Sequence, residues 1–285
     1  MKYMGEIVRN FRISRGLTLK EVCSENFSVA QLSKFERGDS EITFSKLLII
    51  LERMNISMEE FMFSLKDFEL GDLELLLQQL NQHHLSQNIR QLERMIEHED
   101  KLFHETQNKY HHLNSIMIKA MLQDVDTTFC VNETEKDIIT DYLLGTDEWC
   151  YYEMILFANT IHLFNTNMLV MLSKEMVTKT VYYKEIGKNR KILIKTLINI
   201  TIILLERRAL AESLKLMKQI ERLINKETYL YEKNVFMYVK GFYYYQKGDI
   251  ETGKSMMQEA IHIFEVLEST NLAENYREHY KQITG

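Results

Sequence analysis

The sequence predicts an all-α protein of two domains, and three observations support this prediction. The 285 residues include no proline and only 10 glycines, whereas an average chain of this length carries roughly a dozen prolines or more. Proline is rare inside helices because it lacks an N–H donor and collides with the preceding turn. Residues 1–65 contain a series of helix-start signals. The second half of the chain repeats with a period of about 40 residues, which is typical of stacked helical hairpins.

Composition limits the compartment and the kinds of site. The chain is 45% hydrophobic and 27% charged, as in ordinary soluble proteins. Its three cysteines, Cys23, Cys130 and Cys150, lie far apart, which leaves neither a disulfide framework nor a four-cysteine zinc site. The N-terminus lacks the apolar core of a signal peptide, and Lys195 interrupts the longest apolar run, residues 192–205. We therefore expect a protein of the reducing cytoplasm, with no export signal and no membrane span.

The first predicted helix, residues 5–14, is amphipathic. Its apolar positions recur at helical spacing, and Arg9, Arg12 and Arg15 follow on its cationic side. Residues 1–37 hold seven basic and four acidic side chains, a net charge of +3, while the remainder of the chain carries −9. Because salt screens charges beyond about 8 Å, a local basic patch on an acidic protein is enough to contact phosphates.

A pair of short helices joined by a tight turn follows. Thr18 can cap the first helix, and Glu21 completes a capping box three residues later. After a polar corner, Ser28 can cap a second helix that continues through Glu36, and Gly38 ends it in the left-handed conformation that glycine favours. Helix, short turn and helix is the geometry that places the second helix in the major groove of DNA.

The second of these helices is expected to face the bases. Gln31 and Lys34, with Val29 nearby, would contact base edges, while the arginines of the first helix would bind phosphates. Surface charge is the alternative interpretation of those arginines, and Arg37 could bind phosphate or pair with Glu36 or Glu41. The full set of expected DNA contacts is Arg9, Arg12, Arg15, Thr18, Ser28, Val29, Gln31, Ser33, Lys34 and Arg37.

Two further helices complete a five-helix domain over residues 1–65. They are expected at residues 43–54 and, with Ser57 as cap and Glu60 three residues on, from 57 to 63. Residues 66–72 form the expected linker, and 73–285 the second domain. The rest of the small domain's core is expected from Leu47, Leu48, Leu51, Phe61 and Met62.

The second domain is expected to be a superhelical array of hairpins. A shift of about 40 residues aligns Phe164, Leu204 and Tyr244. The last copy resembles a tetratricopeptide repeat (TPR), with signature spacing at Gly241, Tyr244, Gly248 and Ala260, although Gly253 replaces the usual alanine. Such arrays curve into a groove that can bind a peptide or a partner protein.

The predicted groove supplies six candidate ligand contacts. Asn159 and Asn199 are equivalent under the repeat and could pair with a peptide backbone, or satisfy groups within the core. Arg190 could receive a carboxylate, although ordinary surface charge is the favoured alternative. Trp149 is the only tryptophan of the chain, and a lone tryptophan at helical spacing is more often a core residue than a ligand contact. The candidate peptide contacts are Trp149, Tyr152, Asn159, Arg190, Asn199 and Tyr231.

The segment from residue 28 to 52, SxxQLSKFERGDSEIxFSKLLxxLE, resembles the N-terminal domain of Rgg-type (MutR/GadR-like) transcriptional regulators of Gram-positive bacteria. These form a branch of the lambda-repressor-like helix-turn-helix proteins, and Cys23 stands where the wider superfamily prefers alanine. The resemblance extends through Trp149 towards the C-terminus. It implies a homodimer on a two-fold symmetric operator and, as ligand, a short hydrophobic peptide that is secreted and re-imported as a quorum signal. It also implies that peptide-free and peptide-bound forms both occupy DNA.

Motifs for catalysis are absent from the sequence. There is no phosphate-binding loop, no GxSxG elbow and no HExxH pair. Adjacent histidines such as His83 and His84 point to different helix faces, which suits a metal poorly. We expect no catalytic residue, metal or cofactor. The favoured hypothesis is a peptide-responsive transcription factor; the alternative is an interaction adaptor whose helix-turn-helix is vestigial, and a repeat-domain enzyme is the least supported.

Overall fold

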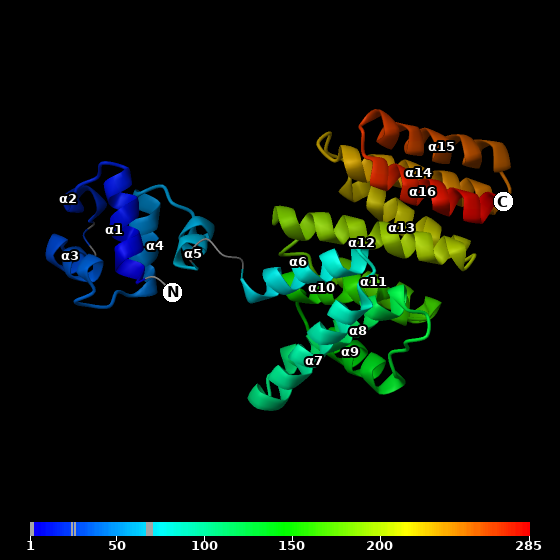
Figure 1. Cartoon of the computed structure of the whole chain (residues 1–285). Helices are drawn as coiled ribbons and strands as arrows, with labels where there is room; N and C mark the ends of the chain where they lie inside the picture. The colour runs from blue at the N-terminus through cyan, green and yellow to red at the C-terminus, as the bar shows by residue number, and fades with distance from the viewer. Residues whose placement is uncertain (1–2, 24, 26, 67–70) are drawn as a thin grey trace. The chain divides into compact units, whose positions relative to one another are not determined.

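The computed structural model describes residues 3–23, 25, 27–66 and 71–285 (Figure 1). These residues form helices, short turns and loops without an extended β-strand, which confirms the all-α prediction. The chain divides into two compact units, Met1–Gln82 and His83–Gly285. The boundary falls inside a helix, α6, that spans Asp72–Leu85. Of the expected linker at 66–72, residues 67–70 lie outside the described residues.

The first unit contains the five predicted helices before α6. They are α1 (Met4–Ser14), α2 (Leu19–Val22), α3 (Val29–Arg37), α4 (Phe44–Arg53) and α5 (Met58–Leu65).

Side-chain caps begin four of these helices and explain why the chain turns where it does. The hydroxyl of Thr18 accepts the backbone N–H of the residue three positions on, as does that of Ser28. Thr43 and Ser57 do the same for α4 and α5. Gly38 ends α3 with a φ of 84°, in the left-handed region that glycine occupies without strain. Each cap contributes about 1 kcal/mol, so local sequence fixes most of the boundaries.

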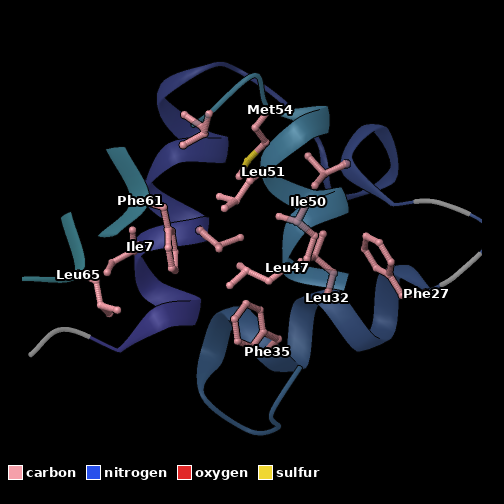
Figure 2. Packing of buried hydrophobic residues seen from close by; sticks show 13 residues of the cluster. Ile7, Phe27, Leu32, Phe35, Leu47, Ile50, Leu51, Met54, Phe61 and Leu65 are labelled. Carbon is pink, nitrogen blue, oxygen red and sulfur yellow. The ribbon is translucent and has the colours of Figure 1, made fainter. Parts of the chain in front are cut away.

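The core of the first unit is one cluster of apolar side chains drawn from all five helices (Figure 2). Its buried members are Ile7, Val8, Val22, Phe27, Leu32, Phe35, Leu47, Ile50, Leu51, Met54, Ile56, Phe61 and Leu65.

Two expected core residues were assigned wrongly. Leu48 and Met62 are 44% and 41% exposed, and Met54 and Leu65 fill the core instead. Leu48 and Met62 lie at the edge of an apolar stripe, where helical spacing alone does not decide which side a neighbouring helix covers.

Close backbone contact holds α1 against α3. A Cβ atom at Gly5 would lie 1.9 Å from the carbonyl oxygen of Phe35, a distance that no side chain tolerates. The two helices can approach this closely only because residue 5 has no side chain.

The second unit is an array of packed helices. The helices are α7 (Ile89–Thr106), α8 (Lys109–Val125), α9 (Glu133–Gly145), α10 (Tyr151–Thr160), α11 (Thr166–Lys179), α12 (Gly187–Glu206), α13 (Leu210–Leu223), α14 (Leu230–Lys247), α15 (Ile250–Val266) and α16 (Thr270–Thr284), with a 3₁₀ turn, η1, at Ile161–Leu163. Helices α8, α10, α12 and α14 each pack against the next in that order. The intervening helices α9, α11, α13 and α15 each pack against at least one of these four or against one another.

The most extensive contact in the second unit joins α14 and α15, which lie side by side in Figure 1. A Cβ atom at Gly241 would lie 2.8 Å from the carbonyl oxygen of Gly253, and one at Gly253 would lie 2.5 Å from the backbone nitrogen of Tyr245. The glycine at 253 that departs from the TPR pattern is therefore what this close crossing requires.

Candidate functional site

The helix-turn-helix presents the start of α3 to solvent. Val29 is 41% exposed, and Ser28, Ala30 and Lys34 are exposed beside it. On the opposite side of the same helix Leu32 and Phe35 are buried in the core. Packing therefore fixes which face of α3 points outward. The Ser28 cap holds the backbone of Gln31, whose N–H donates to the hydroxyl at 3.2 Å.

Gln31 has a partner that sequence reasoning missed. Lys46, in the first turn of α4, donates from Nζ to Gln31 Oε1 at 3.2 Å. Both side chains are half-buried, and Lys46 forms no ion pair with another described residue. The signal in the sequence was the Thr43 cap, which places Lys46 at the start of α4. Nothing local indicates that this turn lies beside α3.

Arg12, one of the expected phosphate contacts, is held in an ion pair within the first unit. Its guanidinium forms a bidentate pair with Glu36, Nε to Oε1 at 2.7 Å and Nη2 to Oε2 at 2.6 Å, and Nη1 donates to the carbonyl of Leu17 at 2.9 Å. The hydrogen bond with Glu36 raises the pKa of Arg12, against the opposing effect of burial. The side chains of Arg12 and Glu36 are only 13% and 4% exposed. The guanidinium thus ties α1 to α3, an arrangement that does not support a phosphate contact.

The other basic candidates remain accessible. Arg9 and Lys34 are exposed and have no ion pair among the described residues, and the Arg15 guanidinium lies 5.7 Å from the ring of Phe11. Arg37 bonds neither Glu36 nor Glu41, the partners that the sequence had suggested.

Arg37 and Ser33 bond each other at the end of α3. The Nε of Arg37 donates to Asp39 Oδ2 at 2.8 Å, and its Nη1 donates to Ser33 Oγ at 2.6 Å. Thr18 lies at the start of α2 with its hydroxyl engaged in the capping box with Glu21.

Trp149 is fully buried in the second unit. Its Nε1 donates to the carbonyl of Leu143 at 3.1 Å, and its ring meets Phe157 edge-on at 5.6 Å. The core interpretation, which the sequence also allowed, fits this position. In this conformation the indole has no exposed surface with which to contact a peptide.

The two aligned amides lie on neighbouring helices. Asn159 is on α10 and Asn199 on α12, helices that pack against each other, and both side chains are half-buried. The Asn159 amide donates to the carbonyl of Ile155 at 3.0 Å. Asn199 forms no hydrogen bond with another described residue, so its donor and acceptor remain available.

Tyr152 and Arg190 are used within the fold. The Tyr152 hydroxyl donates to Asn114 Oδ1 at 3.0 Å, and burial raises the pKa of this tyrosine. The Nη2 of Arg190 donates to the carbonyl of Leu223 at 3.0 Å, and its guanidinium lies 5.8 Å from the ring of Tyr229. The Arg190 side chain is 12% exposed and joins the start of α12 to the end of α13.

Tyr231 belongs to a different part of the second unit. It lines an apolar hollow of about 580 Å³ formed by α14, α15 and α16, together with residues such as Phe264 and Leu272. None of the other peptide candidates lines this hollow.

Neither a membrane-spanning helix nor a metal site is found among the described residues. No helix among them is long and apolar enough to cross a bilayer. No group of three or more histidine, cysteine or carboxylate side chains in that part of the chain could hold a metal ion.

The first unit carries an exposed recognition helix on a five-helix core, and a helical array follows it in the chain. These features define a helix-turn-helix regulator of transcription. A helix-turn-helix family model matches residues 8–61. The model of the C-terminal domain of the HTH-type transcriptional regulator Rgg matches residues 96–278, more than half of the chain. The chain belongs to the Rgg family of transcriptional regulators, as its sequence resemblance implied.

Solved structures agree with this assignment. The Streptococcus dysgalactiae SHP pheromone receptor Rgg2 is 32% identical, with a TM-score of 0.85 over 98% of this chain and 99% of that one. A putative transcriptional regulator from Listeria monocytogenes EGD-e, 22% identical, has a TM-score of 0.86 over 98% and 96% of the two chains. ComR from S. thermophilus, in complex with DNA and its signalling peptide ComS, is 14% identical with a TM-score of 0.62 over 97% and 98%. The last two show similarity of fold.

Proposed function

We propose that this chain is a cytoplasmic regulator that binds operator DNA as a homodimer and responds to a short hydrophobic signalling peptide held by the second unit. The observation that carries the peptide assignment is the pair of half-buried amides on α10 and α12, one of which, Asn199, has no partner among the described residues. An unpaired carboxamide offers a donor and an acceptor to a peptide backbone whatever the peptide's side chains. The relative that is 32% identical is a pheromone receptor, which supports the same assignment.

DNA binding would use the exposed start of α3. Gln31, Lys34 and Val29 would meet base edges, with Thr18, Ser28 and Ser33 close to the sugar–phosphate backbone. Arg9 on α1 and Arg15 at its C-terminal cap are exposed, and both would bind phosphates. A two-fold symmetric dimer would place two such helices about one turn of DNA, roughly 34 Å, apart or at a multiple of that spacing.

The peptide assignment can be tested with synthetic peptides encoded by small open reading frames beside the gene. Each labelled peptide is titrated with full-length protein and followed by fluorescence polarisation. We expect one hydrophobic peptide to bind. Asn199→Ala should weaken its binding by roughly tenfold, because the backbone amide of the peptide that Asn199 contacts would be left unpaired. Asn271→Ala, on the exposed surface of α16, is the matched control.

Equal affinity of wild type and Asn199→Ala would remove Asn199 from the site. The adaptor alternative predicts a different outcome: a protein partner captured by residues 66–285 and no preference among DNA sequences. A sequence-specific shift of promoter DNA by the full chain would exclude it.

A further inference from the structure

The contact between Lys46 and Gln31 affects which base the recognition helix, α3, selects. This inference rests on the DNA-binding part of the proposed function. Nζ of Lys46 lies 3.2 Å from Oε1 of Gln31. The backbones of both residues are held by caps, Gln31 by Ser28 at 3.2 Å and Lys46 by Thr43 at 3.4 Å. The two side chains therefore start from fixed first turns of α3 and α4.

The chemistry of this contact fixes the orientation of the Gln31 amide. A lysine ammonium has three donors and no acceptor, so the atom that faces it must be the carboxamide oxygen. The Nε2 amino group of Gln31 then points away from Lys46. Since Lys46 has no ion pair among the described residues, its charge is not neutralised and its remaining donors are free.

A glutamine that reads adenine needs both ends of its amide. Its oxygen accepts from adenine N6, and its amino group donates to N7. In this protein one lone pair of that oxygen is already used, and an ammonium lies beside it. The positive charge disfavours the hydrogens of the adenine amino group and favours an oxygen acceptor at the same place. Guanine offers two acceptors, N7 and O6, in the major groove.

We propose that Lys46 sets the base specificity of Gln31. The pair presents donors from Gln31 Nε2 and Lys46 Nζ, and it selects guanine over adenine at the base pair that Gln31 contacts. Without the ammonium, Gln31 regains the donor and acceptor pattern that recognises adenine. Lys46 is thus a specificity-determining residue that acts partly through the residue beside it.

The test is selection of bound sequences from a random double-stranded DNA library by the full-length protein. The position contacted by Gln31 is the one whose preference is lost in Gln31→Met. We expect guanine there in the wild type, and a change of about tenfold or more in the ratio of guanine to adenine in Lys46→Met. Lys46→Arg, which keeps charged donors, should retain guanine.

Lys20→Met controls for loss of charge, because Lys20 is exposed on α2 and does not contact Gln31. It should weaken binding without changing the preferred base. Two outcomes would overturn this inference and leave the proposed DNA recognition intact: adenine at the Gln31 position in the wild type, or the same base preference in the wild type and Lys46→Met. A library in which the wild type enriches no sequence would overturn the proposed DNA recognition and this inference with it. Far-ultraviolet circular dichroism confirms that each variant is folded.

Discussion

Replacing Arg12 by methionine should destabilise the first unit by about 3 kcal/mol. The change leaves the Glu36 carboxylate, whose side chain is 4% exposed, without its bidentate partner, and it removes the donor to Leu17. Breaking a buried ion pair by removing one partner costs roughly 3–5 kcal/mol. We take the lower end because Arg12 retains 13% exposure, so water can reach part of the vacated site.

The two units can be followed separately during urea unfolding. The only tryptophan, Trp149, lies in the second unit, so its fluorescence reports that unit, whereas circular dichroism at 222 nm reports helices of both. In Arg12→Met, helix content should begin to fall at lower urea while the Trp149 transition stays in place. The double variant Arg12→Met/Glu36→Leu should recover most of the loss, because an apolar pair replaces the ionic one.

The opposite result would refute this reasoning. A phosphate contact at Arg12 predicts an unchanged circular dichroism transition in Arg12→Met and a salt dependence of DNA binding reduced by about one ion. If that pattern is found, the bidentate contact with Glu36 does not persist in solution.

Two further predictions concern packing and pH. Gly5→Ala should cost roughly 1–3 kcal/mol or more in the first unit, because its Cβ would meet the Phe35 carbonyl at 1.9 Å, whereas Gly145→Ala, with no atom within 4 Å, should be neutral or slightly stabilising by urea unfolding. A hydrogen bond from His84 lowers the pKa of Asp124. A lowered carboxyl pKa stabilises the fold above the unfolded value, about 3.9, and this contribution is lost as pH falls through the lower folded value. The stability difference between wild type and Asp124→Asn should therefore shrink between about pH 5 and pH 2, and a difference that grows over that range would contradict the assignment.

Local signals in the sequence predicted the frame of the DNA-binding unit. Thr18, Ser28 and Ser57 are all helix caps in the structure, and Gly38 is left-handed. A cap is read from residues within one turn of each other, which is why sequence alone suffices.

Contacts between distant segments could not be predicted in this way. Arg12 and Glu36 are separated by 24 residues, and Gln31 and Lys46 by 15. A charged side chain on a helix surface looks the same in the sequence whether it faces solvent or another helix. One of the three arginines expected to bind phosphate, Arg12, is therefore enclosed by packing, while Arg9 and Arg15 are exposed.

Some of the candidate peptide contacts are used within the fold, for a related reason. Trp149, Tyr152 and Arg190 carry both apolar surface and a polar group, and each uses that group to satisfy a carbonyl or an amide inside the second unit. Residue type gave no means of separating such internal roles from ligand contacts. The repeat alignment was more informative, because equivalence in the array placed Asn159 and Asn199 on neighbouring helices.

The close crossing of α14 and α15 at Gly241 and Gly253 limits how these two helices can move relative to each other. At this crossing main chain lies close to main chain, with the side chains of Met257 and Tyr245 beside it, which leaves little room for the two helices to slide. We therefore expect α14 and α15 to move as one rigid pair. Because α12 packs on α14, we expect a displacement of α12 to move α14 and α15 together.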